Sequence, residues 1–181
     1  RLRGLRIVAE VADRCPEKLA PEIEAVSSIA DTPDEREAVA RIYTETISAG
    51  EPPVESAVET LFVWAVECTA QNRATMATTI HTLAIEYPEV AAEHVERLEP
   101  ILDTDSQRLH FLYTRILMEL SPERPETVYR LAEPFLTDSA TDVLRRQNLQ
   151  LYRALVQLVP ERATAELDWF FEQIEAGSED V

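Results

Sequence analysis

The fold is decided by the stretch RLEPILDTDSQRLHF at residues 97–111, in which one apolar run ends and another begins. The first run stops at Asp103, residues 104–107 are polar, and the second run opens at Arg108. Two apolar segments of helical periodicity with polar turn formers between them predict two helices joined by a tight turn. How often the chain repeats this junction then determines the architecture.

Prolines interrupt the helical pattern at nearly even intervals along the 181 residues of the chain. Strand-like alternation is nowhere sustained, and the chain holds three glycines. The repeated prolines are Pro16, Pro52, Pro88, Pro122 and Pro160, separated by 36, 36, 34 and 38 residues. A proline suits the first turn of a helix, because its missing N–H has no partner there. A period of this length predicts helix pairs stacked side by side.

We therefore expect one all-α domain over residues 1–181, in which each helix pair buries its apolar face on its neighbours. The last five residues, 177–181, follow the pattern of a solvated tail. Pro100 and Pro134 lie close to helix ends and are expected to bend those helices. The predicted helices cover residues 2–14, 17–30, 34–48, 54–69, 72–86, 89–102, 106–120, 124–136, 141–158 and 161–175.

Acidic residues and arginines recur at unit spacing near the turns between helices. A carboxylate and a guanidinium can share two parallel hydrogen bonds, so such residues can pair within a unit or along the stack. The second unit lacks the expected Asp. We expect these residues to be structural and not to touch a ligand. The predicted ladder consists of Asp31, Arg36, Arg73, Asp103, Arg108, Asp138 and Arg145.

The helix ends Ile101-Leu102-Asp103 and Phe135-Leu136-Thr137-Asp138, followed by Arg108 and Arg145, resemble those of the HEAT-repeat family. The resemblance covers nearly the whole chain. It implies a right-handed α-α superhelix of about five helix pairs, with an Asp and Arg ladder at the turns. Armadillo-like and tetratricopeptide arrays are the alternative repeat folds. The Trp, Gly and Tyr signature of the tetratricopeptide repeat is missing here.

The formal net charge of −17 is the strongest feature of the composition, and Lys18 is the single lysine among 17 basic residues. Acidic surface with almost no lysine is similar to proteins of extreme halophiles, in which molar salt screens carboxylate repulsion within about 3 Å. An ordinary acidic protein is the alternative. Nucleic acid is a disfavoured partner, because phosphate binding needs clustered positive charge.

The two cysteines, Cys15 and Cys68, have no metal-like spacing and are expected to be reduced core thiols, which fits a cytoplasmic protein. No run of about 18 uncharged apolar residues occurs, so we expect no membrane partner. The sequence starts without Met and without a signal-peptide pattern, which suggests a piece of a longer chain.

No pattern in the sequence points to a cofactor or a catalytic site. Three isolated glycines cannot form a phosphate-binding loop. His81, His94 and His110 occupy unrelated positions in their units, so no metal site is expected. The segment that begins at Asp103 starts like a calcium loop, but Arg108 and Thr114 stand where Gly and Glu are needed.

Candidate partner-binding residues lie on the second helices of the pairs and in one apolar run. Residues 61–66 are apolar all round, so Trp64 is either buried mid-stack or an anchor for a partner. In HEAT-like stacks the second helix of each pair lines the concave side. The side chains that point outward from these helices in the present chain either form a ligand groove or balance the charge of nearby acids. The outward candidates are Arg41, Thr78, Thr114, Arg115, Gln150 and Arg153.

These features predict a non-catalytic scaffold that binds another protein. The alternative is an enzyme that acts on nucleic acid, since some HEAT-like folds are DNA glycosylases for alkylated bases. We also expect that the chain can associate with another copy of itself through its N-terminal end, because the sequence shows no polar capping helix that would cover the apolar side of the first helix.

Overall fold

The computed structural model describes residues 1–52, 55–104, 106–136 and 142–163. In this part of the chain the regular elements are helical and none is a strand. The prediction of an all-α fold is confirmed. Asp138, the tail at 177–181 and most of the helix expected at 161–175 lie outside the described residues.

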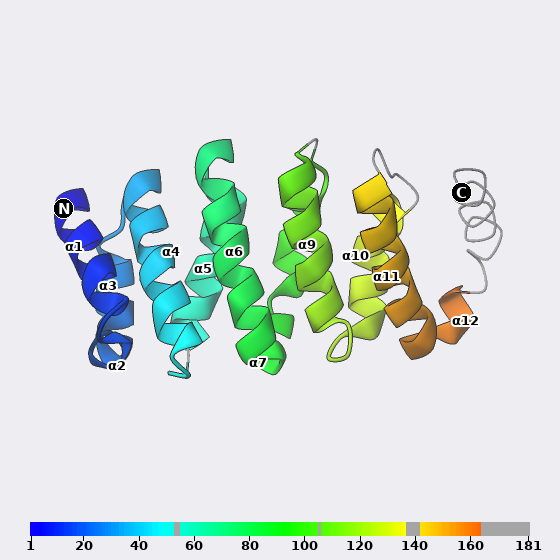
Figure 1. Cartoon of the computed structure of the whole chain (residues 1–181), viewed down its shortest axis with the longest axis horizontal. Helices are drawn as coiled ribbons and strands as arrows, with labels where there is room; N and C mark the ends of the chain where they lie inside the picture. Colours follow the sequence, from blue (N-terminus) through cyan, green and yellow to red (C-terminus); the bar gives the residue numbers. More distant parts are fainter. Residues whose placement is uncertain (53–54, 105, 137–141, 164–181) are drawn as a thin grey trace.

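Five long helices lie side by side and form the first layer of the molecule (Figure 1). Each contacts the next one along the row: α1 with α4, α4 with α6, α6 with α9, and α9 with α11. Their bounds are Leu2–Ala12 for α1, Pro33–Ser48 for α4, Ala70–Glu86 for α6, Gln107–Leu120 for α9 and Asp142–Leu158 for α11.

The second layer consists of the elements between these helices, and they also contact one another in chain order, α3 with α5, α5 with η2, and η2 with α10. Figure 1 shows the two layers running along one long axis with the N-terminus at one end. The bounds are α2 Pro16–Leu19, η1 Ala20–Glu22, α3 Ile23–Ser28, α5 Glu55–Glu67, α7 Pro88–Ala92, η2 Val95–Leu98, α8 Glu99–Leu102, α10 Pro125–Leu136 and α12 Pro160–Ala163.

An apolar core fills the space between the layers along the row, from Leu5 to Val159. Ile80 and Leu83 of α6 and Phe62 of α5 are fully buried in it. Burial of one side chain of this size stabilises the fold by roughly 1.5–3 kcal/mol. Because the described helix pairs all contribute to one continuous cluster, none of them has a separate core.

Two predicted helices are wrong in detail, because prolines divide them. The helix expected at 17–30 is α2, the 3₁₀ turn η1 and α3, with Pro21 inside the turn. The helix expected at 89–102 is α7, η2 and α8, with Pro100 at the start of α8. A proline has no N–H for the bond to the carbonyl four residues earlier, and its ring clashes with that carbonyl. Pro134, in contrast, lies inside α10, which continues to Leu136.

The predicted junction at residues 97–111 is confirmed to within a residue. Helix α8 ends at Leu102, and α9 begins at Gln107. The hydroxyl of Ser106 accepts a hydrogen bond of 3.4 Å from the N–H of Leu109, which caps α9. A side-chain cap satisfies a backbone donor that has no partner inside the helix.

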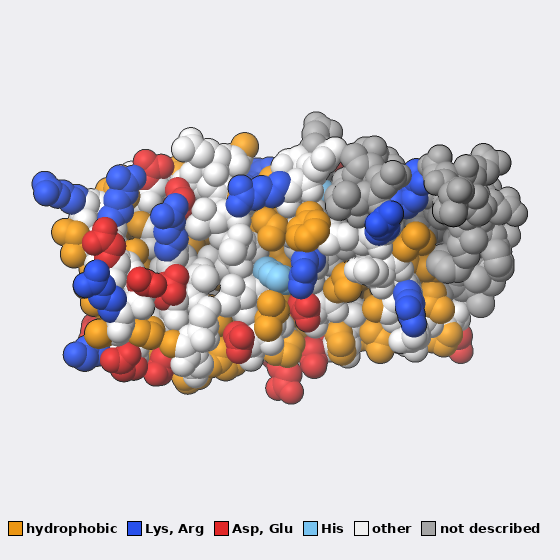
Figure 2. All heavy atoms as spheres, in the orientation of Figure 1, with side chains coloured by type: hydrophobic (Ala, Val, Ile, Leu, Met, Phe, Trp, Pro, Cys, Tyr) orange, Lys and Arg blue, Asp and Glu red, His pale blue; other side chains and the backbone are white. Residues whose placement is uncertain are grey.

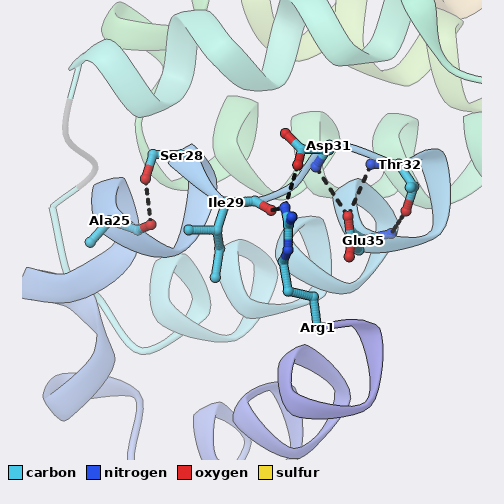
Figure 3. A network of polar contacts seen from close by, with 7 residues as sticks. All are labelled: Arg1, Ala25, Ser28, Ile29, Asp31, Thr32 and Glu35. Carbon is cyan, nitrogen blue, oxygen red and sulfur yellow. Dashed lines mark hydrogen bonds and ion pairs between the residues drawn. The ribbon is translucent and has the colours of Figure 1, made fainter.

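The matching junction between α3 and α4 is capped more completely (Figure 3). The Thr32 hydroxyl accepts from the Glu35 N–H at 3.3 Å, and the Glu35 carboxylate accepts from the N–H groups of Thr32 and Asp31 at 3.0 and 3.1 Å. This reciprocal pair is a capping box. At the other end of α4, Gly50 takes φ 82°, and the N–H of Glu51 bonds the carbonyl of Thr46. Such a left-handed residue ends a helix.

The substitution Thr32→Ala tests the contribution of this capping box. We expect it to lower the free energy of unfolding by about 1 kcal/mol, because the Glu35 N–H loses its acceptor. Thr69→Ala is the matched control, since Thr69 stands at the N-cap of α6 but makes no side-chain cap hydrogen bond. Urea unfolding followed by circular dichroism measures both. An equal loss in the two variants would contradict the assignment.

Candidate functional site

The outward side of α1, α4, α6, α9 and α11 forms one continuous surface, which we name the first-layer face (Figure 2). Five of the predicted partner-binding residues are exposed on its helices. They are Arg41 on α4, Thr78 on α6, Arg115 on α9, and Gln150 and Arg153 on α11. These five expected outward positions therefore share one face.

A groove of about 600 Å³ lies mainly over α1, α4 and α6 on this face, and Arg108 of α9 lines its edge. Arg41 and Thr78 also line it, and Arg41 balances a nearby acid, which was the other role expected of it. Arg41 donates to Glu37 at 2.7 Å, and the Thr75 hydroxyl donates to the same carboxylate at 3.2 Å. Further acids line the groove without an ion pair among the described residues, namely Glu10, Asp13, Asp34 and Glu45. Five carboxylates thus face the guanidinium groups of Arg6, Arg41 and Arg108, so the groove is acidic on balance.

The α9 and α11 half of the face carries the opposite charge. Four exposed arginines, which we name the arginine patch, are Arg108 and Arg115 on α9 and Arg146 and Arg153 on α11. None of the four forms an ion pair with a residue of the described ranges. Figure 2 shows basic side chains on this half with few acidic ones beside them, whereas both kinds mix over α1 and α4.

Second-layer arginines behave differently, because each pairs with a glutamate of the preceding unit. Arg97 donates to Glu59 at 2.6 Å, and Arg162 donates to Glu126 at 2.9 Å. Arg130 reaches both Glu99 and Glu96, at 3.1 and 3.3 Å. This series was not predicted from the sequence. Its signal is an acid followed by an arginine 31 to 38 residues later, which is about the length of one unit.

Asp31, the first acid of the predicted ladder, pairs along the stack and not within its own unit. Its partner is Arg1 at the N-cap of the preceding first-layer helix, not Arg36 (Figure 3). The same guanidinium donates to the carbonyl of Ile29 at 3.2 Å. Arg36 in turn donates to Glu67 at 2.9 Å, so Glu67 takes the place of the Asp that the second unit lacks.

Asp103, Arg73 and Arg108 do not form the expected pairs with one another, and Asp138, the expected partner of Arg145, lies outside the described residues. Asp103 is exposed and has no ion pair with Arg73 or Arg108. Arg73 is half-buried beside the thiol of Cys68. Arg145 is half-buried near the start of α11. The repeated arginines nevertheless share one place, the first turn of a first-layer helix or its N-cap.

Three predicted roles change once burial is known. Trp64 is 6% exposed and packs in the core under the Arg36 guanidinium, 5.6 Å from its ring centre, so it cannot anchor a partner. Thr114 is fully buried and donates to the carbonyl of His110 at 2.9 Å, because it lies on the inner side of α9. Arg108, expected to be purely structural, lines the groove instead.

The histidines occupy separate environments. His110 is buried against Asn148, with 3.1 Å between its Nε2 and the amide oxygen, and His94 packs against the ring of Phe62. His81 lies on α6 close to Arg115 and Glu119. Among the described residues no group of His, Cys, Asp or Glu side chains is arranged to hold a metal ion. Cys68 is buried and Cys15 half-buried, and neither forms a disulfide.

Comparison with known proteins gives no match to a family model, a curated protein or a solved structure. Within the described ranges, no helix has the length and apolar character needed to cross a bilayer.

The ionisation of His81 gives a testable pH dependence. Burial, and after it the Arg115 guanidinium, lowers the pKa of His81 below its ordinary value. The unfolded chain then binds the proton more readily, so the stability that neutral His81 contributes is complete above about pH 6.5 and is lost as the pH falls. We expect His81→Gln to make the free energy of unfolding fall less between about pH 7.5 and 5.5 than it does in the wild type. Equal slopes in parallel urea titrations would contradict this.

Proposed function

We propose that the chain is a non-catalytic protein-interaction scaffold, built as a right-handed HEAT-like superhelix of about five helix pairs. The two-layer row of helices and the period near 36 residues support this architecture. The first-layer face is its binding surface. No cofactor takes part.

The contrast between paired and unpaired arginines carries the proposal. The second-layer arginines, such as Arg97 and Arg130, are held by glutamates of the neighbouring unit. The arginine patch has no such partner among the described residues, although acidic residues outnumber basic ones by 34 to 17. Clustered like charges repel one another, and a partner of opposite charge relieves that repulsion.

The composition supports a cytoplasm rich in salt as the setting of this scaffold. Dense carboxylates destabilise a fold in dilute buffer, and molar salt reduces the range of their repulsion to about 3 Å. The reduced thiol of Cys68 agrees with a cytoplasmic location.

The outer side of α1 is a second contact surface in this proposal. Ile7 and Val11 are 55% and 43% exposed there, as expected of a stacking face without a cover. A second copy of the chain or further repeats of the same kind would cover it.

Affinity capture from the source cell, at the salt concentration of its cytoplasm, tests the scaffold function. We expect wild-type chain to retain a defined protein partner and Arg115→Glu/Arg153→Glu to lose it, because charge reversal at two of the four patch arginines replaces attraction by repulsion. Immunoblotting or mass spectrometry of the retained protein measures the loss.

The control is Arg3→Glu/Arg14→Glu, which changes the net charge equally at two exposed positions of the opposite end of the row. Retention of the partner by this control is expected. If both variants lose the partner, or neither does, the first-layer face is not the binding surface.

An enzyme acting on nucleic acid, such as a HEAT-like glycosylase for alkylated DNA, is the second candidate. The same arginine patch, with Phe111 between Arg108 and Arg115, is the observation in its favour. Against it stand the net charge of −17 and the lack of Lys and Trp on the first-layer helices.

Titration of labelled single- and double-stranded DNA separates the two candidates. For a protein scaffold we expect no saturable binding near physiological salt, because an acidic molecule repels a long polyanion. Binding with a steep dependence on salt, together with release of an alkylated base and none from undamaged DNA, would establish the enzyme instead.

A further inference from the structure

The arginines of the patch are spread over two helices, so a ligand would bind along an extended surface and not at a single point. On each helix its two arginines are seven residues apart, which corresponds to about 10.5 Å along the axis. Helices that pack together, as α9 and α11 do, lie roughly 8–10 Å apart. The backbone positions of the four arginines therefore mark the corners of a field about 10 Å on each side.

Apolar side chains lie inside this field. Phe111 and Leu112 are half-buried between Arg108 and Arg115, and Leu149 is half-buried between Arg146 and Arg153. The core residues of the same helices, such as Tyr113 and Tyr152, point to the opposite side. A ligand on the patch thus meets a central apolar strip with a cation on either flank.

The charge around the field selects the class of ligand. Glu119 is the acid on the outward stripe of α9, and it lies toward His81. The groove begins beside Arg108 and presents five carboxylates, among them Asp34 and Glu45, against the guanidinium groups of Arg6, Arg41 and Arg108. A long polyanion that followed the face would meet these carboxylates. A short segment with few charges would not.

Resting on the scaffold function proposed above, we infer that the arginine patch docks a short acidic segment of a partner protein, with carboxylates about 10 Å apart and an apolar residue between them. A helix with Glu or Asp at seven-residue intervals meets this spacing. Each carboxylate would accept hydrogen bonds from a guanidinium, and the apolar residue would cover Phe111 and Leu112.

Fluorescence anisotropy with the whole chain and three labelled probes tests the inference. The first probe is a helical peptide of about 15 residues with glutamates seven apart and leucines between them. The second has Gln in place of each Glu, and the third is a single-stranded oligonucleotide of similar length. We expect the Glu peptide to bind saturably. The affinity of the chain for each of the other two probes should be lower by about tenfold or more.

Two double variants test whether the peptide binds at the arginine patch. Arg115→Glu/Arg153→Glu should weaken binding of the Glu peptide about tenfold or more, and Arg3→Glu/Arg14→Glu, with the same net charge, should change it by less than about twofold. Arg115→Gln/Arg153→Gln, checked by circular dichroism like the others, replaces the first variant should that one fail to fold. Equal affinity for the Glu and Gln peptides, preference for the oligonucleotide, or equal effects of the two double variants would overturn the inference.

The failure of this inference differs from the failure of the scaffold function. If capture from the source cell depends on Arg115 and Arg153 while the Glu peptide does not bind, the acidic segment is wrong and the binding surface stands. If neither capture nor peptide binding depends on them, both proposals are wrong.

Discussion

Lateral packing of each helix pair on the next is the interaction on which the rest of the structure depends. A pair such as α5 and α6 is too small to bury its own apolar side chains. Ile80 is covered because α4 and α9 lie on either side of α6, and Phe62 is covered because α3 and η2 lie on either side of α5. The core is therefore continuous along the row and ends where the row ends. Exposed Ile7 on α1 is the direct result of this packing at one end.

The same stacking separates the charges into two kinds. Glutamates and arginines on the second layer meet across unit boundaries, as Glu59 and Arg97 do. Exposed pairs of this kind contribute roughly 0–1 kcal/mol each, so their effect lies more in the relative placement of the units than in stability. On the first layer the helices present one stripe each to solvent, and neighbouring stripes join into an acidic groove and a basic patch.

Predictions from the sequence were correct where the structure depends on residues only a few positions apart. The turn from Asp103 to Arg108 was predicted because capping and turn formation involve residues a few positions apart. The prediction was wrong at Pro21, which divides a helix that the apolar period alone would continue. Trp64 could be read either way, because periodicity does not tell how many sides of a helix are covered. The Arg97 and Glu59 pair was missed since its partners are 38 residues apart.

The sequence by itself determined that this protein is helical, where most of its helices end and that its helix-breaking prolines recur every 34 to 38 residues, because proline, capping residues and the apolar period act through the local backbone. Tertiary structure alone decided which arginine meets which acid, that Thr114 is buried and Arg108 exposed, and that Arg115 and Arg153 share one surface. These depend on the rotation of each helix about its axis and on which neighbour it packs against, and a side chain of several bonds can reach more than one partner.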